Sequence, residues 1–155
     1  MKIMEFLSKA AIQADIKSTK KDDIIRELVD LLISAGELDR SARNKVVDAL
    51  MERESLGSTA IGQGIAIPHA KTDSVSKLVG AFALSKKGVD FDSLDGEPVY
   101  IFFMLLAAQD SAGPHLKALA RISRLFKDKY FRDNLRNCVD DNAIIKVISQ
   151  EDEKI

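Results

Sequence analysis

The chain contains two histidines, His69 and His115, and both follow segments that are expected to form β-strands. His69 comes after the apolar run 65–67, and His115 comes after the longest apolar run, 99–108. In open α/β sheets, ligands and reactive side chains gather where strands end, so two histidines far apart in the chain could meet there. The pair is therefore our first candidate for chemistry.

A neutral imidazole is a good nucleophile near physiological pH, because its unperturbed pKa lies close to that range. Its ring nitrogens can accept and release a phosphoryl group. Phosphoryl transfer passes through a loose transition state, so the protein contributes positioning and donors around the phosphate oxygens. With His69 as the acceptor, the candidate donors are Arg53, His115 and the glycine-rich segment between Arg53 and His69.

The sequence around His115 predicts a helix start that binds an anion. Pro114 suits the first position of a helix, which would place His115 in the first turn. Backbone N–H groups in that turn lack partners within the helix, and the helix dipole adds partial positive charge. A phosphate is an anion that such a turn can bind.

The glycine-rich segment is a candidate phosphate-binding loop, formed by Gly57, Ser58, Thr59, Gly62 and Gly64. Its spacing begins like a P-loop, but Gln63 and Gly64 replace the lysine and the hydroxyl residue of that motif. A dinucleotide fingerprint also fails, because Ile67 occupies its third glycine position. We therefore expect turns here and no nucleotide site.

Each candidate also has an ordinary structural interpretation. A histidine after a strand is more often a packed residue than a nucleophile, and an arginine on a helix is most often solvated. Cys138 is the only cysteine, so no internal disulfide can form, and we expect a packed side chain. A metal-dependent hydrolase using both histidines with Asp73 or Asp110 is a further alternative. We expect no metal and no cofactor.

The spacing of apolar residues predicts the elements that would position these groups. Helices are expected at 18–35, at 39–54, beyond Gly113, at 130–135 and at 141–148. Strands are expected at 65–67, 78–84 and 98–107, and the last of these is apolar throughout. Ser41 would cap the second helix. In the third, Leu116 would face the core and Arg121 would face solvent.

Strands in the middle of the chain, with helices before and after them, predict an α/β fold with a mixed sheet flanked by helices on both faces. A chain of 155 residues, of which 46% are hydrophobic, can bury one substantial core. We expect a single domain over residues 1–150, followed by a frayed polar tail at 151–155.

Charge and hydropathy narrow the classes of function. The 23 basic and 24 acidic residues nearly cancel, which argues against nucleic acid or an acidic membrane surface as a partner. Residues 1–10 lack the apolar core of a secretory signal, and the run at 99–108 is too short to span a bilayer. We expect a cytoplasmic protein that does not insert into membranes.

Residues 53–70, RESLGSTAIGQGIAIPHA, closely resemble the signature around the phosphorylated histidine in IIA domains of the fructose and mannitol class. These domains belong to the sugar phosphotransferase system (PTS). The resemblance continues through AKTDSV at 70–75, GVDFDSLDGEPVYIFFMLLAA at 88–108 and HLKALARISRLF at 115–126. It covers most of the chain and implies the fold of PTS EIIA type 2 domains.

The resemblance implies that His69 accepts the phosphoryl group, and that His115 and Arg53 orient His69 and stabilise the phosphate. It also implies an HPr-like phosphocarrier as donor and a IIB domain as acceptor in the uptake of a fructose- or mannitol-class sugar. The nitrogen-regulatory branch shares the signature, and there the phosphorylation state would control binding to transporters or kinases. Both branches stay open, as do the sugar and the ring nitrogen that carries the phosphate.

Overall fold

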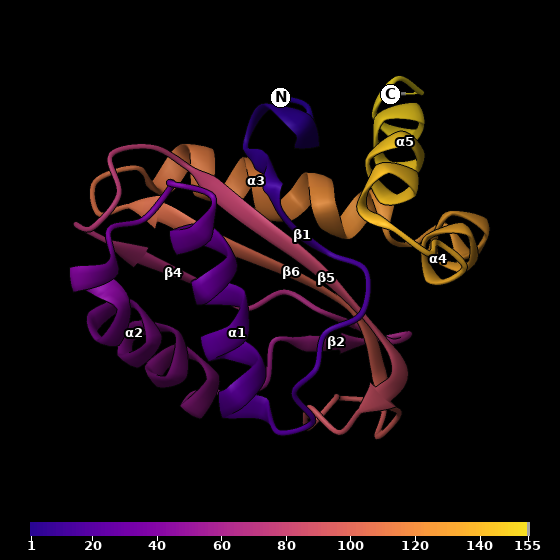
Figure 1. Cartoon of the computed structure of the whole chain (residues 1–155), viewed down its shortest axis with the longest axis horizontal. Helices are drawn as coiled ribbons and strands as arrows, with labels where there is room; N and C mark the ends of the chain where they lie inside the picture. Colours follow the sequence, from indigo (N-terminus) through magenta and orange to yellow (C-terminus); the bar gives the residue numbers. More distant parts are fainter. Residues whose placement is uncertain (155) are drawn as a thin grey trace.

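The computed structural model describes residues 1–154, in which a mixed six-stranded sheet lies between two layers of helices (Figure 1). The strands are β1 (Leu7–Gln13), β2 (Ala60–Gly62), β3 (Ile65–Ala66), β4 (His69–Thr72), β5 (Val79–Val89) and β6 (Val99–Ala108). They lie in the order β1-β5-β6-β3-β2, and β4 also pairs with β6. β6 runs antiparallel to β5 and parallel to β3 and β4.

β6 is the central strand, and all of its residues except Tyr100 are buried. Alternate side chains enter opposite faces of the sheet, as the pleat requires. Phe102 and Met104 belong to the apolar cluster on one face, while Phe103 and Leu105 belong to the cluster on the other. The strand is therefore buried on both faces, which confirms the prediction from its continuous apolar sequence.

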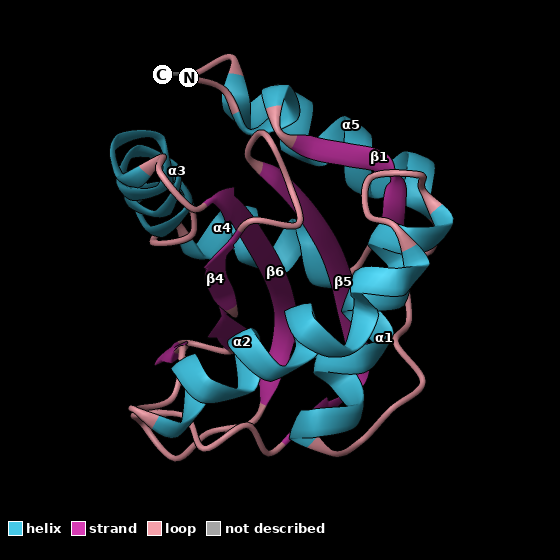
Figure 2. Ribbon diagram, turned by 90° about the vertical axis from the view of Figure 1, so that its left-hand side faces the viewer, coloured by secondary structure: helices cyan, strands magenta, loops and turns pink. Residues whose placement is uncertain are grey.

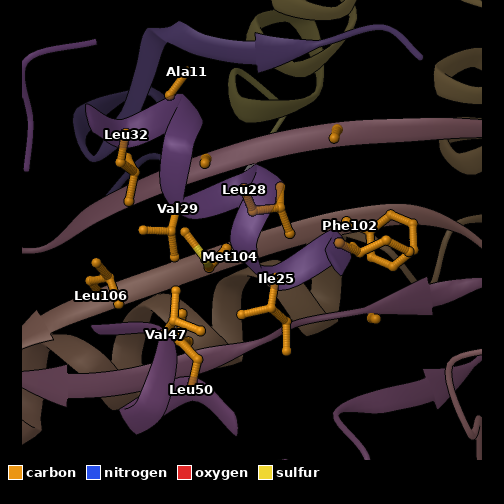
Figure 3. Close-up of a cluster of buried hydrophobic side chains, with 14 of the residues drawn as sticks. Ala11, Ile25, Leu28, Val29, Leu32, Val47, Leu50, Phe102, Met104 and Leu106 are labelled. Carbon is orange, nitrogen blue, oxygen red and sulfur yellow. The ribbon is translucent and has the colours of Figure 1, made fainter. Parts of the chain in front are cut away.

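Helices cover both faces of the sheet, as predicted from the sequence (Figure 2). One face carries α1 (Lys21–Ser34) and α2 (Arg43–Ser55), and the other carries α3 (Ala112–Leu125), α4 (Lys129–Arg136) and α5 (Asp141–Asp152). Figure 3 shows Leu28 and Val29 of α1 beside Met104 of β6. No helix within residues 1–154 is long and apolar enough to cross a membrane.

Two local sequence predictions are wrong. Ser41 does not cap α2, because it lies in the short 3₁₀ helix η2 (Arg40–Ala42), where its hydroxyl bonds to Asp39. β5 extends to Val89 rather than ending at Leu84. The added residues are mostly polar, and the strand rejoins β6 after a register shift, where Val89 pairs with Val99.

The face that α3 buries also differs from the prediction. Arg121 is only 9% exposed, whereas Leu116 is 66% exposed. The Nη2 atom of Arg121 lies 3.0 Å from a carboxylate oxygen of Asp152, so a buried ion pair compensates the charge. Apolar periodicity could not reveal this pair, because its acidic partner lies 31 residues further along the chain.

The predicted frayed tail is wrong for Glu151 and Asp152, which belong to α5. Asp152 is 2% exposed, and its carboxylate accepts hydrogen bonds of 3.0 Å from the backbone N–H groups of Ile3 and Met4. These residues form the short 3₁₀ helix η1 (Ile3–Glu5). The packed structure therefore continues past residue 150, while position 155 lies outside the described residues.

Candidate functional site

The backbone around His69 follows β6 with one interruption. β3 pairs with Ile101 and Phe102, and β4 begins at His69, which pairs with Leu105. Pro68 lies in the gap, where it has no N–H to donate, and its carbonyl accepts a bond of 2.9 Å from Leu105. His69 therefore begins a second short strand along β6, whereas the sequence predicted only that it follows the strand at 65–67.

A hydrogen bond fixes the tautomer of the His69 ring. Its Nδ1 atom lies 2.8 Å from the carbonyl oxygen of Ile67. A carbonyl oxygen can only accept, so Nδ1 carries the proton, and the lone pair of the neutral ring lies on Nε2. Nε2 is therefore the nitrogen that can act as a nucleophile.

The second histidine reaches the same place from α3. The rings of His69 and His115 lie edge to face, with their centroids 5.3 Å apart. His115 is 5% exposed, and its Nδ1 atom has no hydrogen-bond partner within residues 1–154. Buried polar atoms without partners are uncommon in native proteins and can mark a functional site. The meeting of the two histidines confirms the prediction from their positions in the chain.

The start of α3 differs from the predicted anion-binding turn. The helix begins at Ala112, so Pro114 is its third residue rather than its first. The backbone N–H of His115 lies 3.3 Å from the carbonyl oxygen of Ser111 and is already used within the helix. His115 can therefore contribute to the site through its ring, but its amide is not available to a phosphate.

The two rings open into a pocket of about 490 Å³, which is also lined by Arg53 from the last turn of α2. The Nη1 atom of Arg53 donates a 2.8 Å bond to the carbonyl oxygen of Gly57. That bond orients the guanidinium, which has five N–H donors in all. Lys71 of β4 lines the pocket as well, although sequence reasoning did not single it out. The pocket thus combines a nucleophile with cationic groups.

Both rings are held in the neutral form. Burial lowers the pKa of His69 below its ordinary value of 6.5, and the charge of Arg53 acts in the same direction. The hydrogen bond to Ile67 and the charge of Glu54 oppose this shift. Burial likewise lowers the pKa of His115, with further contributions from His69 and Lys71. The neutral form of His69 is the form that can attack phosphorus.

The structure does not bring the predicted phosphate-binding loop into the pocket, since none of its five residues is part of the lining. Ser58 donates to the carbonyl oxygen of Phe91, and Thr59 bonds to the buried carboxylate of Glu54. Gly62 ends β2 and Gly64 precedes β3, and their positive φ angles of 101° and 80° are ones that glycine adopts without steric cost. Gly57 contributes indirectly, because it holds Arg53.

The geometry gives no support to the metal-dependent alternative. Within residues 1–154, no group of three or more His, Cys, Asp or Glu side chains could hold a metal ion. Asp73 instead pairs with Lys45, and Asp110 does not line the pocket. Cys138 is buried, at 5% exposure, as predicted for a packed side chain.

Sequence comparisons find relatives that extend over nearly the whole chain. The fructose-specific EIIABC component of the PTS from Bacillus subtilis is 45% identical over 153 residues, which cover 98% of this chain and 24% of that protein. The chain thus spans about a quarter of the length of that relative. A nitrogen regulatory protein from Bradyrhizobium diazoefficiens is 39% identical over 149 residues, covering 96% of this chain and 95% of the relative.

Solved structures show the same fold. The nitrogen regulatory protein IIA-Ntr from Neisseria meningitidis superposes with a TM-score of 0.84 at 32% identity, covering 94% of this chain and 98% of that one. The complex of enzyme IIA mannitol and phosphorylated enzyme IIB mannitol from Escherichia coli gives 0.75 at 20% identity, covering 91% of this chain and 95% of that one.

The family described as "Phosphoenolpyruvate-dependent sugar phosphotransferase system, EIIA 2" matches residues 5–151, nearly the whole chain. Together with relatives above 30% identity that align over almost the full sequence, this match settles the family. The chain belongs to the EIIA type 2 family of the phosphoenolpyruvate-dependent sugar phosphotransferase system.

Proposed function

We propose that this chain is a phosphohistidine carrier in which Nε2 of His69 accepts a phosphoryl group and passes it to a partner protein. EIIA components transfer phosphoryl groups within the phosphotransferase system during sugar uptake. The observation that carries the proposal is the meeting of His69, His115 and Arg53 in one open pocket.

The proposed step needs no separate general base. The lone pair on Nε2 of neutral His69 forms the new bond to phosphorus, while the N–P bond of the donor phosphohistidine breaks and its electron pair returns to the donor ring. Positive charge develops on the accepting ring during the step. The carbonyl oxygen of Ile67, 2.8 Å from Nδ1, stabilises that charge through the existing hydrogen bond.

The other polar groups of the pocket act on the transferred phosphate. The planar guanidinium of Arg53 can bind two phosphate oxygens at once, and Lys71 adds a second positive charge. A ring N–H of neutral His115 supplies a further donor beside His69. Fixed donors of this kind stabilise the loose transition state of phosphoryl transfer without rearranging during the step.

The rim of the pocket fits a docking partner. Leu56 at the end of α2 is 81% exposed and Leu116 on α3 is 66% exposed, and both line the pocket. Exposed leucines around a reactive group are surfaces that a partner protein can cover. We assign this rim to an HPr-like phosphocarrier as donor and then to a IIB domain as acceptor, in the cytoplasm. The relative from B. subtilis favours a fructose-class sugar.

A second candidate function is regulatory. A nitrogen regulatory relative aligns over 95% of its own length, and the structure of another has a TM-score of 0.84. In that role His69 is still phosphorylated, but the phosphorylation state controls which transporter or kinase the protein binds. Both roles therefore share the first step and differ in the acceptor.

The first step can be tested with a phosphorylated HPr-like carrier and intact-mass spectrometry. The wild-type chain is expected to gain one phosphoryl group, and His69→Ala is expected to gain none. A wild type that stays unlabelled, or a His69→Ala variant that is labelled equally, would overturn the proposal.

The two roles separate in a second measurement on the labelled protein. Transfer of the label to a fructose-class IIB domain supports the transport role. Pull-downs that recover different partners with the phosphorylated and unphosphorylated forms support the regulatory role, and identical partner sets argue against it.

A further inference from the structure

We propose that Glu54 is a positioning residue for His69, acting through Thr59 and Ile67 to hold the nucleophilic ring in its tautomer and orientation. The inference rests on the proposed function, because its purpose is to prepare Nε2 of His69 for phosphoryl transfer. Glu54 does not line the pocket, so it does not touch the phosphate.

Glu54 is a buried carboxylate at the end of α2, with 5% exposure. One carboxylate oxygen accepts a 3.2 Å hydrogen bond from the backbone N–H of Thr59, and the other accepts from the Thr59 hydroxyl. The ammonium of Lys21, in the first turn of α1, lies 2.9 Å from the carboxylate. Glu54 thus ties the start of α1, the end of α2 and the loop after α2 together.

From Thr59 a chain of hydrogen bonds reaches the His69 ring. The carbonyl oxygen of Thr59 accepts a 3.1 Å bond from the N–H of Ile67. The carbonyl oxygen of Ile67 in turn accepts the 2.8 Å bond from Nδ1 of His69. Each bond holds the backbone of the next residue in place, so together they fix the position of the final acceptor, the carbonyl oxygen of Ile67. The link runs through the break between β3 and β4, where the Ile67 carbonyl faces the ring.

Glu54 and Arg53 are neighbours in the sequence, but their side chains point to different places and have opposite effects on the pKa of His69. Arg53 lines the pocket, whereas Glu54 points into the protein toward Thr59 and Lys21. The positive charge of Arg53 lowers the pKa of His69, and the negative charge of Glu54 raises it. Glu54 therefore offsets part of the effect of a phosphate-binding cation on the basicity of the nucleophile.

If Glu54 only held a loop in place, the loss of a similar loop anchor elsewhere should affect His69 to the same extent. The chain offers such an anchor as a matched control. Glu27 in α1 also holds a loop through a backbone N–H and a hydroxyl of one residue, since its carboxylate accepts from the N–H of Ser18 at 2.9 Å and from the Ser18 hydroxyl at 2.6 Å. It also accepts from the N–H of Lys17 at 3.0 Å, but that loop does not line the pocket. Glu27→Gln therefore removes a similar anchor without touching the link to His69.

The test compares Glu54→Gln with Glu27→Gln in three measurements. These are the rate of labelling by a phosphorylated HPr-like carrier, the pH dependence of that rate, and the tautomer of His69 from ¹⁵N NMR of the imidazole nitrogens. We expect Glu54→Gln to slow labelling about tenfold or more, because small displacements of a reacting group cost large factors in rate. The pH of half-maximal rate should move down, and the fraction of Nδ1–H tautomer should fall. Glu27→Gln should leave all three unchanged.

A second pair of variants covers the case in which Glu54→Gln does not fold. Thr59→Ser keeps the hydroxyl that bonds Glu54 and should retain the wild-type rate and tautomer, whereas Thr59→Val should show the same defects as Glu54→Gln. Wild-type behaviour of Glu54→Gln would overturn the inference, and where Glu54→Gln does not fold, wild-type behaviour of Thr59→Val would overturn it. A wild type that is never labelled would instead overturn the proposed function, and the NMR measurement would still decide the role of Glu54.

Discussion

The ion pair between Arg121 and Asp152 gives a prediction that can be worked out from the structure. Asp152→Ala removes a carboxylate that is bonded to Arg121 and to the N–H groups of Ile3 and Met4, all within a buried region. Breaking a buried ion pair costs about 3–5 kcal/mol. Arg121 keeps its bond to the backbone carbonyl of residue 152, so we expect the lower end, about 3 kcal/mol.

For a chain of this length, about 3 kcal/mol corresponds to a fall in Tm of about 6–12 °C. The assay is thermal and urea unfolding followed by circular dichroism at neutral pH. The control is Glu153→Ala, which removes the exposed partner of Lys2 and should change the free energy of unfolding by less than about 0.5 kcal/mol. If Asp152→Ala unfolds like Glu153→Ala, the C-terminal turn does not anchor the N-terminus and the reasoning is refuted.

Three further predictions concern the pocket. His115→Ala should keep the fold but slow single-turnover labelling of His69 about 100-fold, because one fixed donor beside the phosphate is lost; an unchanged rate would remove His115 from the mechanism. Arg53→Lys keeps the charge but loses the planar fork, so labelling should slow about tenfold or more, and a normal rate would mean that paired binding of two oxygens is not needed. Because burial lowers the pKa of His69 below 6.5, the labelling rate should fall only as the pH drops through that lowered value, and a half-maximal rate above pH 6.5 would contradict this. The same shift lowers stability at acid pH, since below 6.5 the unfolded state binds protons that the folded state does not.

The layers of the fold and the meeting of the histidines could be predicted from the sequence because both depend on long, regular patterns. β6 is apolar at every position, and the apolar stripe of α1 includes Leu28 and Val29, so the type of each element is clear. His115 lies in the first turn of the helix that comes next after β6, so its place beside the end of β6 follows from the order of the elements.

The features that sequence reasoning missed depend on contacts between distant residues. The helical pattern predicts that Arg121 faces solvent, but in the structure it is buried in an ion pair with Asp152. The same pattern predicts that Leu116 is a core residue, but in the structure it is exposed and lines the pocket. β4 contains only the residues His69–Thr72, which is too short to show a period, and its pairing with β6 alone defines it. Such partners emerge only from the packed structure.

The contact between the two ends of the chain has a consequence for how this fold can be built into longer proteins. The Nζ atom of Lys2 lies 2.7 Å from the carboxylate of Glu153, so additional polypeptide on either side would emerge from a single attachment point. A short peptide joining these ends, with new termini cut in an exposed loop, should therefore give a circular permutant that still folds. For the same reason, this domain could be joined to other domains of a multidomain chain through short linkers.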